Sequence, residues 1–385
     1  MGDVRLGRHF ELEFPLQGLD QESGVQLDVV IWSGEGFTGP LQAAHHEIAL
    51  ETARQGIVLL KNDGVLPLQI GGPGVMGVGC NLFLLPRSPL EELRAMLPGA
   101  QIEFDPGMTA GEAALMAARC DVAIVFAVRV ETEGFDAADL SLPWGQDAVI
   151  EAVADANPNT IVVLETGNPV AMPWRERVRG ILQAWYPGQA CGRAIAKILT
   201  GTVNPSGWLP RICPADLAQT PRPDLDGRGT PWGPPTTIHY HEGAEVGRRW
   251  FAPTDRERLY AFGHGLSYTR FAYDELVGGG GATITASFTV TNTGTRRGAD
   301  VPQLDLTSAA GEQRTRLLGS ERVELEPGAS RRATLTADAR LLARFDAHAG
   351  QWHISAGSYH VALGRSVSTP VLTADTQLAQ RRFGR

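Results

Sequence analysis

The feature that most restricts the fold of this chain is an alternation of apolar runs with helix-like segments between about residues 41 and 200. Apolar residues at helical spacing up to Gly56 run directly into the apolar stretch 57–60. Further strand-like runs occupy residues 75–79, 122–128, 161–164 and 181–186, and helices are expected at residues 110–119, 146–156 and 189–200. Strands that are apolar throughout and separated by helices form a mostly parallel sheet covered on both faces. The sequence therefore predicts an α/β layer.

A different periodicity begins after about residue 270. Residues 282–291 alternate between polar and apolar, and short runs of the same kind are expected to be strands at residues 301–306, 314–325, 331–336, 351–355 and 359–363. Such a series predicts a β-sandwich, with the glycine run 278–281 as a hinge or a loop at its entrance. Residues 205–235, rich in proline and glycine, are expected to cross the surface. The predicted fold class is α/β followed by all-β, divided into a lead-in at 1–41, an α/β sandwich domain at 42–269 and a β-sandwich at 270–378.

Composition excludes several functions. The 385 residues carry a formal net charge of -9, so no basic field is available for nucleic acid. No apolar stretch approaches the length of a membrane span, and the first residues lack the apolar core of a secretory signal. We therefore expect no membrane partner and a cytoplasmic location as the chain is written, or a periplasmic or secreted one if a further N-terminal region precedes it. The four cysteines are widely spaced and are expected to be buried and unpaired.

The strongest chemical signal is the carboxylate-rich stretch 131–143, which directly follows the apolar run 122–128. A buried strand that presents Glu131 and Glu133 beside Gly134 is a suitable place for a proton donor in sugar chemistry. Glycosidic cleavage usually requires a second carboxyl group on the opposite side of the bond. The sequence pattern does not identify that group.

Several separated motifs share an order and spacing with a known family. They are the stretch 56–68, Glu131-Thr-Glu-Gly-Phe-Asp136 with Leu140-Ser-Leu-Pro143, Asn157-Pro-Asn-Thr160, Gly167-Asn-Pro-Val170, Trp185-Tyr-Pro-Gly-Gln189, the stretch 201–207 and Phe262-Gly-His-Gly-Leu-Ser-Tyr268. On these motifs, residues 42–370 resemble the C-terminal half of family 3 glycoside hydrolases, the β-glucosidase and β-xylosidase group.

The resemblance implies a division of labour between domains. In that family a (β/α)8 barrel carries the nucleophile, an aspartate in a Ser/Thr-Asp-Trp segment, an α/β sandwich lends the general acid/base, and many members add a fibronectin-III-like domain. No Ser/Thr-Asp-Trp segment occurs in this sequence, and the lead-in is too short for a barrel of typically ~250 residues. We therefore expect these residues to supply an acid/base but no nucleophile. The expected partners are a β-linked oligosaccharide or glycoside and a separately encoded barrel or a second copy of the chain, with no cofactor or metal.

By the same resemblance, Glu133 is the predicted acid/base, while Glu131 and Asp136 are predicted to contact substrate. Glu131 competes with Glu133 for the catalytic role, because alternate residues of an extended segment point to opposite sides. Asp136 precedes Ala137, where relatives carry arginine, so a charge partner of the loop is lost.

Other candidates are weaker. His264 is expected to bond backbone carbonyls rather than to act as a base. Arg248 stands where relatives more often have tyrosine, in a segment expected to pack the two domains together. A glycine pair at Gly77 and Gly79 resembles a dinucleotide fingerprint only faintly, because the third glycine is absent. The rival function is a non-catalytic carbohydrate-binding or interaction module derived from such an enzyme.

Overall fold

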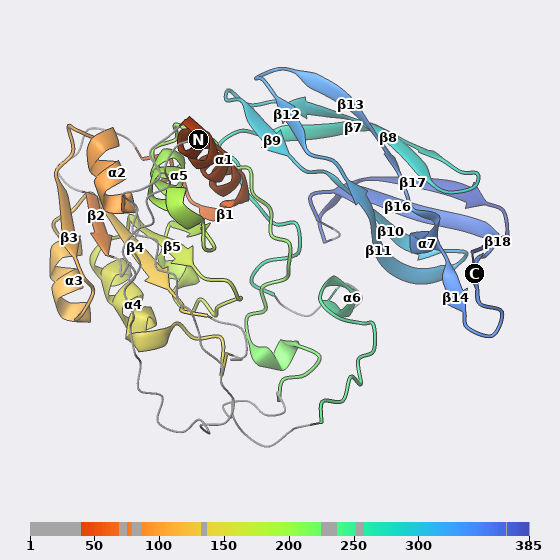
Figure 1. The fold of residues 1–385 in the computed structure, drawn as a ribbon, viewed down its shortest axis with the longest axis horizontal. Coiled ribbons are helices and arrows are strands. Elements are labelled where there is room, and N and C mark those ends of the chain that lie inside the picture. The colour runs from red at the N-terminus through yellow and green to blue at the C-terminus, as the bar shows by residue number, and fades with distance from the viewer. Residues whose placement is uncertain are drawn as a thin grey trace, which may run out of the picture.

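The computed structural model describes residues 40–68, 75–78, 87–131, 137–224, 237–251, 258–366 and 368–384. Almost all of the expected lead-in lies outside these residues. Figure 1 shows an α/β layer at one end of the molecule and a β-rich domain at the other. Within the described residues, no helix is both long and apolar enough to cross a membrane.

The α/β layer is built on a six-stranded sheet with the strand order β1-β6-β5-β4-β2-β3. All neighbouring strands are parallel except β1, which runs antiparallel to β6 at the edge of the sheet. The strands are β1 (Val58–Asn62), β2 (Val75–Val78), β3 (Ile102–Asp105), β4 (Val122–Val128), β5 (Thr160–Glu165) and β6 (Gly180–Gln183). The mostly parallel sheet predicted from the apolar runs is confirmed.

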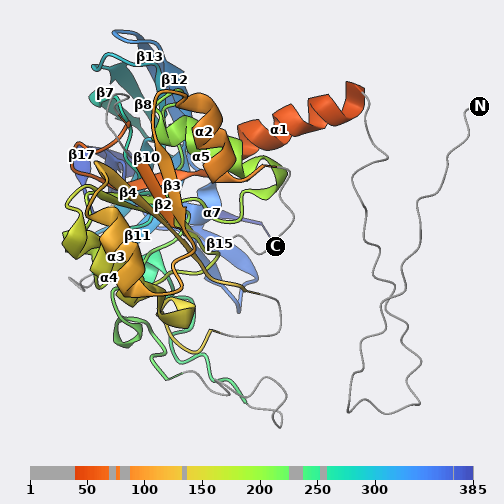
Figure 2. The ribbon, with the colours of Figure 1, turned by 90° about the vertical axis from the view of Figure 1, so that its left-hand side faces the viewer.

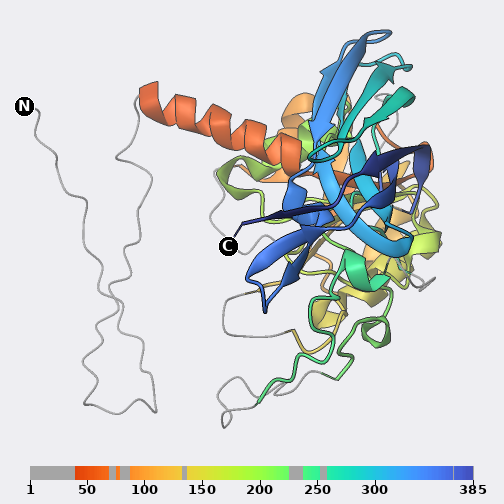
Figure 3. The same cartoon turned by 90° about the vertical axis from the view of Figure 1, so that its right-hand side faces the viewer.

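Helices cover both faces of this sheet. The helices α1 (Pro40–Gly56), α2 (Pro89–Met96) and α5 (Cys191–Leu199) pack on one face, while α3 (Ala110–Ala117) and α4 (Gln146–Ala156) pack on the other. Alternate residues of β4 and β5 enter the two cores, so Val162 and Leu164 face α3 and α4 while Ile161 and Val163 face α1, α2 and α5. The N-terminal part of α1 projects from the layer (Figures 2 and 3).

The sequence-based assignment missed α2 and β3 and made β6 too long. Ser88 caps α2 and forms a reciprocal capping box with Glu91, a signal present in the sequence. The expected strand at residues 181–186 ends at Gln183, because Trp185 adopts a left-handed backbone with φ 63°.

The C-terminal domain consists of antiparallel sheets around one apolar core. A four-stranded sheet orders β11 (Glu312–Ser320), β10 (Gln303–Ala309), β16 (Gly357–Gly364) and β17 (Pro370–Leu378). A three-stranded sheet joins β13 (Ser330–Thr336), β8 (Thr285–Asn292) and β7 (Phe271–Gly279), and β9 (Gly298–Asp300) pairs with β12 (Val323–Leu325). A further sheet consists of β14 (Arg344–Asp346), β15 (Gln351–Ile354) and β18 (Arg381–Phe383). The short helix α7 (Ala339–Leu342) directly precedes β14, whereas the short helix α6 (Arg248–Phe251) lies before the first strand of this domain in the sequence. The predicted all-β domain is confirmed.

The glycine run at the entrance of this domain is not a free hinge. Gly278 and Gly279 belong to β7 and pair with Ala286 and Thr285 of β8. The hinge alternative is therefore wrong for the first half of the run, because the backbone there is engaged in a ladder. The strands β7, β9, β14, β17 and β18 were not predicted from the sequence.

The junction between the domains is closely packed. The amide of Leu266 donates to the Leu59 carbonyl at 2.8 Å, and the hydroxyl of Tyr268 donates to the Ile198 carbonyl at 2.9 Å. His264 Nε2 lies 2.8 Å from the Leu60 carbonyl, which agrees with the structural role predicted for this histidine. Burial lowers the pKa of His264, so the ring is a neutral packing element.

Candidate active site at the carboxyl edge of the sheet

Three parallel strands end side by side at one edge of the sheet, and the residues that follow them form the candidate site. Residues 129–131 follow β4, residues 166–168 follow β5 and residues 184–186 follow β6. Polar groups beyond the carboxyl ends of parallel strands converge in this way in open α/β sheets. This edge therefore brings Glu131 together with groups that are distant in the sequence.

The carboxylate of Glu131 is held by groups from both neighbouring strands. The backbone amide of Asn168 donates to Oε2 at 2.9 Å and approaches Oε1 at 3.1 Å. The hydroxyl of Tyr186 lies 3.1 Å from Oε2 and also donates to the Arg129 carbonyl. Burial of the hydroxyl, followed by the adjacent negative charge, raises the pKa of Tyr186 to about 12, so this group stays a donor.

Gly167 makes the approach of this carboxylate to the chain feasible. A Cβ atom at Gly167 would overlap Oε2 of Glu131 and would touch the ring of Tyr186. The glycine of the Gly-Asn-Pro-Val motif is thus explained by space for a side chain 36 residues earlier in the sequence.

The other predicted site residues, Glu133 and Asp136, lie outside the described residues. Their roles stay predictions. Substrate contact by Glu131 also stays a prediction, although its carboxylate already accepts hydrogen bonds within the protein.

Both sides of the carboxylate-rich loop are tied at its base. The Arg129 guanidinium donates to the Asp139 carbonyl at 2.8 Å and lies 3.6 Å from the Asp139 carboxylate. The Arg129 side chain is only 10% exposed, so this contact is shielded from solvent on the arginine side. Arg129, which follows β4, thus supplies a cation to Asp139 on the other side of the loop.

Arg211 and Trp185 hold the backbone next to Glu131 in place. The Arg211 guanidinium donates to the Gly167 carbonyl and stacks 4.6 Å from the centre of the Trp185 ring. Trp185 in turn donates from Nε1 to the Gly56 carbonyl at 2.9 Å. Sequence reasoning placed Trp185 and Tyr186 in a family motif but assigned them no role, and it missed Arg129 and Arg211.

A second carboxyl group, Glu165, lies at the end of β5 but is buried, with 6% of its surface exposed. Burial raises its pKa to about 7. Glu165 faces the core beneath α5, as do Ile161 and Val163, and not the side chain of Glu131. Among the described residues, no group of three or more His, Cys, Asp or Glu side chains is placed to hold a metal ion.

Large apolar side chains surround the edge and remain exposed. Val130 is 53% exposed, Tyr186 is 51% exposed and Trp144 is 65% exposed. Trp144 lies near the end of β4, because the Gln146 side chain bonds both the amide and the carbonyl of Val128. An exposed apolar surface of this kind is typical of a site that is covered by another domain or partner.

The segment 237–251 contacts both domains: Trp250 donates to the Gln219 carbonyl, and Arg248 reaches the all-β domain. Arg248 forms an ion pair with Asp305 of β10, and the Asp305 side chain is 2% exposed. The guanidinium also lies 5.2 Å from the centre of the Phe262 ring. The packing role expected for this segment agrees with these contacts.

The structure thus combines an α/β layer that presents a carboxylate at the carboxyl edge of its sheet with an all-β domain that follows it. The Glycosyl hydrolase family 3 C-terminal domain matches residues 57–268, and the Fibronectin type III-like domain matches residues 302–367. The chain belongs to glycosyl hydrolase family 3.

Relatives and solved structures agree with this assignment. Thermostable beta-glucosidase B of Acetivibrio thermocellus is 35% identical over 369 residues, covering 86% of this chain and 48% of that protein. Beta-glucosidase B of Emericella nidulans is 39% identical over 274 residues, covering 66% of this chain and 32% of that protein. The chain thus spans between about a third and a half of the length of these relatives.

The structural likeness extends over nearly the whole chain. The GH3 beta-glucosidase of Bifidobacterium adolescentis superposes with a TM-score of 0.79 at 30% identity, covering 90% of this chain and 55% of that one. DesR, a beta-glucosidase from Streptomyces venezuelae solved in complex with D-glucose, superposes with a TM-score of 0.76 at 26% identity, covering 87% and 60%. The predicted family and fold class are confirmed.

Proposed function

We propose that this chain is the C-terminal part of a retaining β-glycosidase that hydrolyses terminal β-linked glucosides. In this proposal Glu133 is the general acid/base. A barrel domain, on the same or a separate polypeptide, supplies the aspartate nucleophile. The proposal is supported by the family membership and by the β-glucosidase activity named for the relatives.

The proposed chemistry requires two carboxyl groups on opposite sides of the glycosidic bond. The barrel aspartate attacks the anomeric carbon while Glu133 donates a proton to the departing oxygen. Glu133 then removes a proton from the water that hydrolyses the glycosyl-enzyme intermediate. The barrel face desolvates Glu133, which would keep its pKa above that of a free glutamate and leave it protonated before the first step.

The observation that carries this proposal is the anchoring of Glu131. Of the two glutamates, Glu131 accepts hydrogen bonds from Asn168 and Tyr186, which belong to the scaffold. Because the Glu131 carboxylate is already engaged by these donors, the role of proton donor is better assigned to Glu133, two residues further along the chain. The exposed side chains of Val130, Trp144 and Tyr186 supply an apolar surface for the barrel.

The purified chain alone should show no turnover of aryl β-glucosides, because one carboxyl group cannot complete the double displacement. Adding the barrel of a related enzyme in trans should restore hydrolysis. Glu133→Gln should then slow substrates with poor leaving groups by about 10²-fold or more, and activated aryl glucosides much less.

A matched control is Glu103→Gln, which removes a half-buried carboxylate on the edge strand β3. Turnover by the chain alone that disappears in Glu133→Gln would show that a nucleophile exists within these residues and would overturn the two-domain proposal. If the complemented enzyme hydrolyses substrates with poor and with activated leaving groups at rates that Glu133→Gln does not change, Glu133 is not the general acid.

A further inference from the structure

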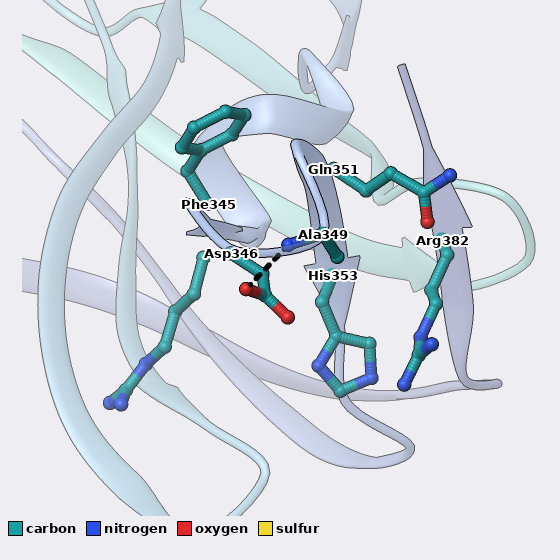
Figure 4. A pocket seen from close by; sticks show the side chains of 7 residues that line it. Phe345, Asp346, Ala349, Gln351, His353 and Arg382 are labelled. Carbon is teal, nitrogen blue, oxygen red and sulfur yellow. Dashed lines mark hydrogen bonds between the residues drawn. The ribbon is translucent and has the colours of Figure 1, made fainter. Parts of the chain in front are cut away.

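The small sheet β14-β15-β18 presents two chemically different faces. Its register places Arg344 opposite His353, and His353 opposite Arg382, so these three side chains form one row across the strands. Asp346 and Gln351 form the next row on the same face. Figure 4 shows Asp346, Gln351, His353 and Arg382 around a hollow that Arg344 also lines.

The opposite face of the sheet is aromatic. Phe345 pairs with Trp352, and Trp352 pairs with Phe383, in the same registers. The rings of Phe345 and Trp352 lie 5.2 Å apart, and Trp352 and Phe383 pack against the core of the domain. Figure 4 shows Phe345 pointing away from Asp346 and His353. The aromatic face therefore fixes the hairpin and pre-organises the polar face.

The hollow on the polar face has a volume of about 110 Å³. This is well above the roughly 10–15 Å³ that one water requires by the same measure. The hollow is therefore large enough to accept part of a small polar molecule.

Opposite charges nearly cancel around the hollow. Arg344 forms an ion pair with Glu312, and Asp346 lies within the hollow on the same face as Arg382. The Asp346 Oδ1 atom accepts the amides of His348 at 3.0 Å and Ala349 at 3.1 Å, which fixes the carboxylate in its turn. A polyanion gains little from such balanced charge. A polyhydroxylated ligand gains more, because the donors of Arg382 and Gln351 and the acceptor carboxylate of Asp346 line the same hollow.

We propose that this hollow binds one sugar unit of a gluco-oligosaccharide through the hydroxyl groups of the sugar. The polar lining of the hollow consists of Arg344, Asp346, Gln351, His353 and Arg382, and Phe345 and Ala349 complete it. The guanidinium groups and the Gln351 amide donate, the Asp346 carboxylate accepts, and paired donors and acceptors on planar side chains suit adjacent hydroxyls. The choice of a glucose-containing ligand rests on the proposed function. In Figure 1 β14 lies in the domain at the opposite end of the molecule from β4, so this site is separate from the candidate active site.

The test is calorimetric titration of the full chain with cellotetraose, with glucuronic acid as an anionic probe. We expect saturable binding of cellotetraose that weakens about tenfold in Gln351→Ala and in Arg382→Ala, since each loses about one hydrogen bond. Arg332→Ala, which removes an exposed arginine of β13, is the matched control and should bind as the unchanged chain does. Circular dichroism of each variant checks that the domain remains folded.

Binding of cellotetraose that is unaffected by both variants would place the sugar elsewhere and overturn the proposal, as would absence of binding. Binding of glucuronic acid alone, abolished by salt, would identify an anion site and overturn the polyol assignment. Because the titration needs no barrel and no hydrolysis, failure of the proposed glycosidase function would leave its result unchanged.

Discussion

Replacing Glu131 by alanine tests whether this carboxylate positions the acid/base loop. The substitution removes a charged acceptor from the Asn168 amide and the Tyr186 hydroxyl. Hydrogen bonds to a charged group contribute about 1.5–3 kcal/mol each, and the half-buried position of Glu131 favours the lower end of that range. If the anchored conformation of the loop loses about 2 kcal/mol of free energy relative to the released one, kcat/KM should fall about 30-fold.

The assay is hydrolysis by the barrel-complemented chain on a series of aryl β-glucosides with different leaving groups. Glu131→Ala should reduce kcat/KM by up to about 30-fold, with the larger loss on poor leaving groups, because the proton donor is misplaced but still present. Glu131→Gln keeps an acceptor oxygen and should lose only about fivefold.

Gly167→Ala offers an independent route to the same defect. Its added methyl group would occupy the space of the Glu131 carboxylate, so its leaving-group dependence should resemble that of Glu131→Ala. Full activity of both variants would refute the positioning role. If Glu131→Ala abolishes hydrolysis of substrates with poor leaving groups while Glu133→Gln leaves kcat/KM unchanged, Glu131 is the proton donor.

Three further predictions concern stability. Burial raises the pKa of Glu165 from 4.5 to about 7, so the folded state holds a proton that the unfolded state loses between these values, and stability should fall by about 3 kcal/mol from pH 4.5 to 7. Urea unfolding across this range should show that loss, and Glu165→Gln should abolish it. Removing one partner of the buried pair, by Asp305→Asn, should destabilise the chain by about 3 kcal/mol, while Arg248→Met with Asp305→Leu should recover most of that loss in the same assay. Gly207→Ala should lower the thermal midpoint by several degrees, because its Cβ would lie 2.5 Å from the Ile57 carbonyl oxygen; an unchanged midpoint would contradict this close approach.

Local sequence patterns were sufficient to predict a mostly parallel α/β layer followed by an all-β domain. The apolar run that became β4 and the amphipathic stretch that became α4 were predictable because local periodicity decides both. The weakly patterned β3 was not predictable, since its residues are half-buried or exposed and the strand is completed by its neighbour β2. The glutamates of the loop were identified from a family motif, because their spatial neighbours cannot be read from the sequence.

The contacts of Glu131 could not be predicted from local sequence patterns. Its partners Asn168 and Tyr186 are 37 and 55 residues away, and they meet it because three parallel strands end at one edge. The pairing of Arg248 with Asp305 spans 57 residues and joins two domains, so no local pattern could reveal it. Short-range periodicity specifies strands and helices, whereas the packing of the sheet and the domain junction selects which distant polar groups become neighbours.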